Sequence, residues 1–130
     1  MKDLCPPGWP RPKGYSNAMA ARGRIVMTAG VVGWNEQQEF IEKTLAGQFA
    51  QTLRNILAIL ACDGAGARQI MRLTCYVTSI EEYLDSAKEI GAAWREIMGK
   101  HYPAMALVEV VRLVEREAKV EIEATAVVPE

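Results

Sequence analysis

Two stretches of this sequence place apolar residues at intervals of three and four, which is the period of an amphipathic helix. The first is predicted to span Phe40–Ala61 and to end before Gly64 and Gly66. The second is predicted to begin with the capping box Ser79–Glu82, whose Ser hydroxyl and Glu carboxylate would each bind free amides of the first turn. It should end near Met98, with Gly99 as its C-cap. The two apolar stripes are Ile41, Leu45, Phe49, Leu53, Ile56 and Leu60, and Leu84, Ala87, Ile90, Gly91, Trp94, Ile97 and Met98.

Segments rich in strand-forming residues surround these helices, and Gly and charged residues punctuate them. The predicted strands are Tyr15–Ala21 and Arg24–Ala29, which would pair as a hairpin, then Ile70–Val77, and finally Met105–Val114 and Ala118–Val127, joined by the charged turn Glu115–Glu117. The order β-β-α-β-α-β-β predicts an α+β fold, in which βαβ crossovers build a mixed sheet with two helices on one face.

The length of 130 residues predicts a single domain over 1–130, because it is close to the commonest domain size. Residues 1–14 hold four of the six prolines. Proline fixes φ and lacks the backbone donor, so this segment is predicted to be an extended arm.

Two helices can cover only one face of such a sheet. Yet Met105–Val114 is mostly apolar at both odd and even positions, which is the pattern of a strand buried on both faces. The chain offers no second layer, so we expect another subunit to cover the second face. Leu107 and Val111 are candidates for that interface.

The formal net charge is -1, and Lys and Arg do not concentrate in any segment, so nucleic acid is not an expected partner. No segment approaches the roughly 20 consecutive apolar residues of a membrane span. The three cysteines, Cys5, Cys62 and Cys75, are odd in number and widely spaced, which favours free thiols in a reducing compartment over a disulfide. We expect a soluble, cytoplasmic protein.

Few residues carry recognisable chemistry. His101 is the single histidine and is expected to be a loop or surface residue, so no metal site is predicted, and no nucleotide-binding glycine motif suggests a cofactor. In the last strand, Glu121, Glu123 and Thr125 share one face. A carboxylate that is partly desolvated at an interface can act as general acid or base. Alternatively, both glutamates line a wet sheet edge or pair with basic side chains.

Several short motifs resemble those of one known family. They are Pro12-Lys-Gly-Tyr-Ser-Asn-Ala18, Thr28-Ala-Gly30, Gln48 with Asn55, Tyr76-Val-Thr78, Tyr102-Pro-Ala104, Val108-Glu-Val110 and Val120-Glu-Ile-Glu-Ala124. From about Trp9 to Pro129 the chain resembles the YjgF/YER057c/UK114, or Rid (reactive-intermediate deaminase), family. The resemblance implies a chorismate-mutase-like α+β domain that forms a homotrimer with three clefts between subunits.

The best-known members of this family hydrolyse reactive enamines and imines such as 2-aminoacrylate. The resemblance implies that Glu121 positions the attacking water and that Tyr15 and Gly30 complete the cleft. It also places Met105 where the family has an arginine that binds the substrate carboxylate, and Val31 where a glutamine is usual.

Methionine cannot form the charge-assisted pair that arginine offers a carboxylate. Small 2-imino acids are therefore not expected to be good substrates.

Two functions remain open. The chain could be a hydrolase that deaminates a larger or less acidic enamine or imine, with backbone amides near Ala106 and Leu107 as donors and no cofactor; retention of Tyr15 and Glu121 favours this function. It could instead be a non-catalytic trimer that binds a small molecule, which the loss of the arginine favours. Some family members have been called ribonucleases, but the weak net charge disfavours that activity.

Overall fold

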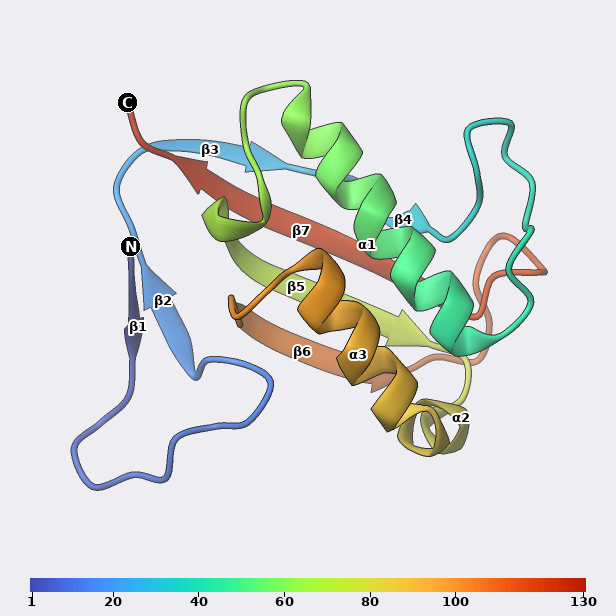
Figure 1. Ribbon diagram of the computed structural model, residues 1–130, viewed down its shortest axis with the longest axis horizontal. Coiled ribbons are helices and arrows are strands. Elements are labelled where there is room, and N and C mark those ends of the chain that lie inside the picture. The colour runs from blue at the N-terminus through green and yellow to red at the C-terminus, as the bar shows by residue number, and fades with distance from the viewer.

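The computed structural model describes all 130 residues, and Figure 1 shows its elements. In chain order they are β1 (Lys2–Leu4), β2 (Ala18–Ala20), β3 (Arg24–Met27), β4 (Val31–Val32), α1 (Leu45–Ala61), the short 3-10 helix η1 (Ala67–Gln69), β5 (Ile70–Val77), α2 (Ile80–Asp85), α3 (Ala87–Ile97), β6 (Ala104–Glu109) and β7 (Val120–Val128).

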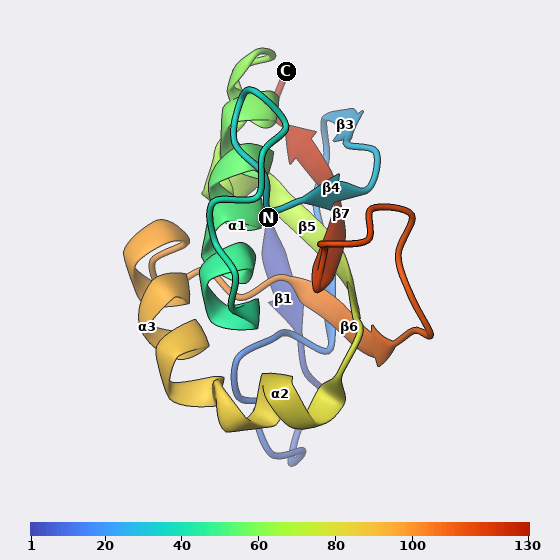
Figure 2. The same cartoon turned by 90° about the vertical axis from the view of Figure 1, so that its right-hand side faces the viewer.

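The main sheet has the strand order β3-β7-β5-β6, and β4 also pairs with β7. Strands β5 and β6 are parallel, whereas β7 is antiparallel to β3, β4 and β5. Helices α1 and α3 cover one face of this sheet, and no helix covers the other face (Figures 1 and 2). The predicted α+β fold with its helices on one face is confirmed. No helix is both long and apolar enough to cross a membrane.

The two faces of β7 have different surroundings: one packs in the core beneath the helices, and the other is open. Its even-numbered residues Val120, Ile122, Ala124 and Ala126 are buried in the core with Leu45, Phe49, Leu53, Ile56 and Leu60 of α1 and with Ile70, Leu73, Cys75 and Val77 of β5. The odd-numbered Glu121, Glu123 and Thr125 lie on the opposite, open face, as the period-2 pattern predicts. The three cysteines are free, and burial raises the pKa of the Cys75 thiol to about 12.

Helix α1 begins later than predicted. The Thr44 hydroxyl accepts a hydrogen bond from the Gly47 amide at 3.0 Å and so caps the helix, which Phe40 cannot do. The preceding residues form a loop, in which Ile41 is 65% exposed rather than part of the apolar stripe. Phe40 instead packs with Val32 in a small second cluster.

The second predicted helix is in fact two helices, α2 and α3, which meet at Ser86 with φ −98° and ψ 8°. Leu84 is 63% exposed, so its assignment to the buried stripe is wrong. Only half of the capping box forms, because the Ser79 hydroxyl accepts from the Glu82 amide at 3.1 Å but the Glu82 carboxylate binds elsewhere. Gly99 follows α3 with φ 68°, as expected for a residue that ends a helix.

The predicted hairpin between Tyr15–Ala21 and Arg24–Ala29 is wrong. Strand β2 pairs with β1 from the N-terminal arm, and β3 pairs with β7 from the other end of the chain. Gly23 directs the chain between them: its φ is 147°, and a side chain there would collide with the Val128 carbonyl of β7. The proline-rich arm is extended as predicted but contributes a strand.

Strand β6 is shorter than predicted, and β5 separates it from β7. Residues 110–119 form a loop on the open side of the sheet (Figure 2), and Val111 in this loop is 99% exposed. Met105 and Leu107 pack against the helix-side core. Neither Leu107 nor Val111 therefore lies on the uncovered face of the sheet.

Three large apolar side chains do lie exposed on the open face. Ile25 and Met27 of β3 are 64% and 70% exposed, and Val108 of β6 is 45% exposed. In the strand register Met27 is opposite Thr125 and Val108 is opposite Tyr76, so these residues share the open face with the β7 carboxylates. They lie on the two edge strands of a face that no helix covers, which leaves this face accessible to another subunit. The homotrimer itself remains a prediction.

We expect Met27→Asp to dissociate the oligomer, because an unpaired carboxylate buried in a subunit interface is strongly unfavourable. Light scattering should report about 43 kDa for the wild type, three times the chain mass of 14.4 kDa, and the monomer mass for the variant. Leu84→Asp, on the helical side, is the matched control and should leave the mass unchanged. A monomeric wild type at micromolar concentration would contradict this prediction.

Candidate functional site

Glu121 lies near the start of β7, and its carboxylate lies against the backbone of Gly30. A methyl group added at Gly30 would come within 2.5 Å of Glu121 Oε2, so glycine leaves the space that this carboxylate occupies. Glu121 is half-buried, yet its side chain forms no hydrogen bond or ion pair with the protein. Its oxygens are therefore free to accept a hydrogen bond from water or a ligand.

The adjacent glutamate has a different environment. Tyr76 of β5 donates a hydrogen bond from its hydroxyl to Glu123 Oε1 at 2.9 Å. This hydrogen bond, with smaller contributions from burial and from the charges of Glu123 and Glu121, raises the pKa of Tyr76. Glu123 is thus engaged by the protein while Glu121 is not. Tyr76 was not predicted as a site residue, although its position in a strand of period 2 places it on the open face.

Helix α1 fixes the backbone that leads into β7. Gln48 is 1% exposed, and its Nε2 donates to the carbonyls of Glu117 at 2.9 Å and Glu42 at 3.2 Å. Its Oε1 accepts from the Lys119 amide at 2.7 Å. Since Lys119 precedes β7 directly, these bonds set where the strand starts and hence which face Glu121 occupies.

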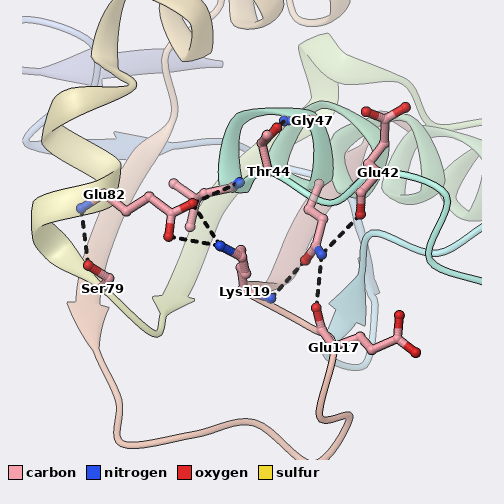
Figure 3. A network of polar contacts seen from close by, with 9 residues as sticks. Glu42, Thr44, Gly47, Ser79, Glu82, Glu117 and Lys119 are labelled. Carbon is pink, nitrogen blue, oxygen red and sulfur yellow. Dashed lines mark hydrogen bonds and ion pairs between the residues drawn. The ribbon is translucent and has the colours of Figure 1, made fainter.

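An ion pair reinforces this connection on the side of α2. Lys119 Nζ lies 3.1 Å and 3.0 Å from the two carboxylate oxygens of Glu82 (Figure 3). The Glu82 carboxylate also accepts from the Leu45 amide at 3.2 Å, at the start of α1. The carboxylate that was predicted to close the capping box of α2 thus joins α1, α2 and β7.

A second α1 residue, Asn55, holds β4, the strand that pairs with β7 at Glu121. Asn55 Nδ2 donates to the carbonyls of Val32 at 3.0 Å and Trp34 at 2.7 Å. Val32 in β4 is the register partner of Glu121. Gln48 and Asn55, two helical turns apart, therefore fix β7 and β4 around the carboxylate.

Tyr15 and Met105 meet at a different place. They line a cavity of about 270 Å³ together with Lys13, Gly14, Tyr83 and Leu107. A neighbouring cavity of about 290 Å³ extends from Met105 over an apolar wall that includes Phe49, Ile90 and Trp94. The cleft beside Met105 is therefore mainly apolar.

Within one chain the predicted site residues form two separate groups. Glu121 and Gly30 lie on the open face, whereas the Met105 side chain lies on the helix side, two strands away across β5. Neighbouring strands are about 4.8 Å apart, so the two groups are roughly 10 Å apart across the sheet alone. A single small substrate cannot contact both groups of one chain.

The remaining predicted residues are Val31, Ala106 and Leu107, and they lie in three different environments. Val31 is buried in the core, so its side chain does not line either cavity. Ala106 is exposed on the open face. The Val110 amide donates to Val77 of β5, and strand alternation then points the Ala106 amide toward β5 and the Leu107 amide toward the free edge of β6. Only the latter is available as a donor.

No three His, Cys, Asp or Glu side chains lie together in a way that could hold a metal ion. His101 lies half-buried in the loop before β6, where its Nε2 is 2.6 Å from the Ile70 carbonyl. Its loop position was predicted, and its contact is structural.

The arrangement of helices, sheet and motifs agrees with one family. The family model described as Endoribonuclease L-PSP matches residues 10–128. The chain belongs to this family. The predicted relationship to Rid proteins is confirmed, since relatives and solved structures carry that name.

Two relatives and two solved structures illustrate the similarity. The chain is 29% identical over 108 residues to the 2-iminobutanoate/2-iminopropanoate deaminase of Escherichia coli, covering 81% of this chain and 80% of the relative. It is 30% identical over 119 residues to a RutC family protein of Pyrococcus horikoshii, covering 90% of each. The structure of the Rid protein YyfB from Yersinia pestis superposes with a TM-score of 0.83 at 28% identity and 98% coverage of both chains. That of the E. coli YjgF protein gives 0.68 at 27% identity, with 98% of each covered.

We expect Gln48→Met, which keeps the side-chain volume but loses all three hydrogen bonds, to lower the free energy of unfolding by about 2–4 kcal/mol. The reason is that the Lys119 amide and the Glu117 carbonyl lose their buried partner. Gln51→Met is the control: this side chain makes a single bond to Asn55, and its loss should cost less than about 1 kcal/mol. Urea unfolding measures both. Equal losses would show that Gln48 does not fix β7.

We also expect Glu123→Gln to lower the pKa of Tyr76 towards its ordinary value, because the mutation removes the carboxylate acceptor, the largest cause of the increase. Ultraviolet titration of phenolate absorbance measures this pKa, and subtraction of the Tyr76→Phe titration isolates the residue. Glu121→Gln should lower it less, since Glu121 acts only through its charge. A larger effect of Glu121→Gln would contradict the observed pairing.

Proposed function

We propose that this protein is a hydrolytic deaminase of a small imine or enamine and that its cleft lies between subunits. In the reaction, water adds to the carbon of the C=N bond and a proton is transferred to nitrogen. The C–N bond of this adduct then breaks, so that ammonia leaves and a carbonyl compound remains. In this proposal Glu121 takes the proton from water and Tyr15 donates a proton to the nitrogen.

The observation that carries the proposal is the free carboxylate of Glu121, which lies beside Gly30 on a sheet face that the chain leaves uncovered. Such a carboxylate can hold a water molecule, and a covering subunit would exclude bulk solvent from it. The relationship to the E. coli 2-iminobutanoate/2-iminopropanoate deaminase supports this reaction class.

The separation of the two residue groups supports a shared site. Glu121 and Gly30 of one subunit would meet Tyr15 and Met105 of a neighbour across the interface. A cyclic trimer repeats such a heterologous contact three times and leaves no unpaired surface. The apolar cavity beside Met105 favours a substrate without a carboxylate at that position, and hence a larger or less acidic imine than a 2-imino acid.

The replacement of the family arginine by Met105 also favours a second function, a trimer that binds a metabolite without turning it over. A screen of imines distinguishes the two. Imines are generated in solution by amino-acid or amine oxidases, and the acceleration of ammonia release is measured. Acceleration by the wild type that is absent without protein supports the enzyme; saturable binding with no acceleration supports the binder.

On the substrate found by this screen, Glu121→Gln should lower kcat at least about 100-fold, because an amide cannot take the proton from water. Glu123→Gln, the matched control two residues along the same face, should retain most of the activity, since Glu123 binds Tyr76. Unchanged turnover in Glu121→Gln would exclude Glu121 as the base.

Mixed oligomers test the location of the site. Glu121→Gln and Tyr15→Phe chains, each inactive alone, are refolded together. If each site takes one residue from each of two subunits, random mixing should restore about a quarter of the sites. If both residues act within one chain, no activity returns.

Met105→Arg should raise hydrolysis of 2-iminobutanoate at least about tenfold, because even a partial charge-assisted pair with the carboxylate contributes about 1.5–3 kcal/mol. Met105→Leu is the apolar control and should not raise the hydrolysis of 2-iminobutanoate. Fast wild-type hydrolysis of this substrate would show that another group binds the carboxylate. A trimeric but inactive Met105→Arg variant would favour the binding function.

A further inference from the structure

One cavity of the chain includes neither Glu121 nor Met105. It has a volume of about 590 Å³ and lies where the β1–β2 pair meets the end of the main sheet. In Figure 1 this pair lies beside the end of the sheet at which β7 ends and η1 and β6 begin. Val127 and Pro129 line the cavity, and Val127 is six residues beyond Glu121, or about 20 Å along an extended strand.

Five basic side chains from five places in the chain line this cavity. They are Lys2 of β1, Arg11 of the arm, Arg22 before β3, Arg68 of η1 and Lys100 of the loop before β6. The only acidic residue in the lining is Asp3, which forms an ion pair with Arg11.

The other four basic side chains form no ion pair or hydrogen bond with the protein. The acidic partners of the chain's remaining ion pairs are Asp63, Glu117, Glu96 and Glu82, none of which lines the cavity. Four uncompensated positive charges around one cavity are notable in a chain with a net charge of -1. Like charges gathered in this way repel one another, and an anion relieves that repulsion.

Tyrosine side chains form part of the remaining wall. Tyr15 and Tyr102 both line the cavity, and the Tyr102 ring is stacked on Trp94, with an interplanar angle of 5°. His101 is held by the Ile70 carbonyl. Contacts with the rest of the protein thus hold Tyr102 and His101 in the wall of this cavity.

We propose that this cavity binds a small molecule that carries a diphosphate or two neighbouring phosphate groups. Two phosphates carry about three to four negative charges at neutral pH, which matches the four free basic side chains. Arginine binds phosphate oxygens in pairs and lysine adds a mobile charge, and both residue types are present here. The volume is that of a small-molecule site rather than of a groove for a polymer.

This inference does not depend on the proposed deaminase activity. It concerns different residues, except for Tyr15, and its test measures binding rather than turnover. A negative imine screen would not argue against phosphate binding in this cavity, and absence of phosphate binding would not affect the deaminase proposal.

Isothermal titration of untagged wild-type protein with inorganic pyrophosphate tests the proposal. We expect saturable binding with one site per chain, weaker binding of inorganic phosphate, and loss of affinity as ionic strength rises. Arg22→Ala and Arg68→Ala should each weaken pyrophosphate binding at least about fivefold, because each removes a charge-assisted contact. Arg116→Ala removes an equal charge from an exposed loop outside the cavity and should leave the affinity unchanged.

Several results would overturn the proposal. They are the absence of saturable pyrophosphate binding, equal weakening by Arg116→Ala and Arg68→Ala, and binding of succinate as tight as that of pyrophosphate. A short single-stranded RNA that displaces pyrophosphate and binds much more tightly would show that the surface serves nucleic acid instead. Circular dichroism of each variant confirms that the comparison is between folded proteins.

Discussion

Strand β7 pairs along both edges, with β3 and β4 on one side and β5 on the other, while its two faces meet different surroundings. A slip of one residue would move Glu121 and Glu123 into the core and expose Ile122. Gln48 opposes such a slip, because it binds the Glu117 carbonyl and the Lys119 amide, on either side of Ala118 and just before β7 begins at Val120. The sheet, the core and the placement of the carboxylates all follow from this one register.

The same register explains why the candidate site is incomplete in a single chain. Glu121 can lie on the open face only if its neighbours in the strand lie beneath α1, and the helices then cover the face on which Met105 packs. Met27 and Val108 are large apolar residues that lie exposed on this open face. The proposed intersubunit site would bring together the two groups of residues that one chain keeps apart.

Acidic and basic side chains gather in different parts of the molecule, although the net charge is only -1. Carboxylates lie on the open face towards the start of β7, whereas Arg22, Arg68 and Lys100 gather around a cavity at its end. Lys and Arg do not concentrate in any segment of the sequence, which therefore predicted no basic patch. The patch exists because residues from distant segments are brought together by the β1–β2 pair and by the loop before β6.

What the sequence determined by itself is the part of the fold that depends on local periodicity and local caps. The bounds of β5, the alternation of β7 and the role of Gly99 could be read from residues near in sequence, and the family motifs could be read in the same way. Contacts between distant residues could not. Only the tertiary structure decided that β2 pairs with β1, that Glu82 binds Lys119 rather than its own helix, and that Tyr76 binds Glu123 while Glu121 stays free. The physical reason is that strand pairing and side-chain hydrogen bonds select among many partners by spatial proximity, which packing creates and no local pattern encodes.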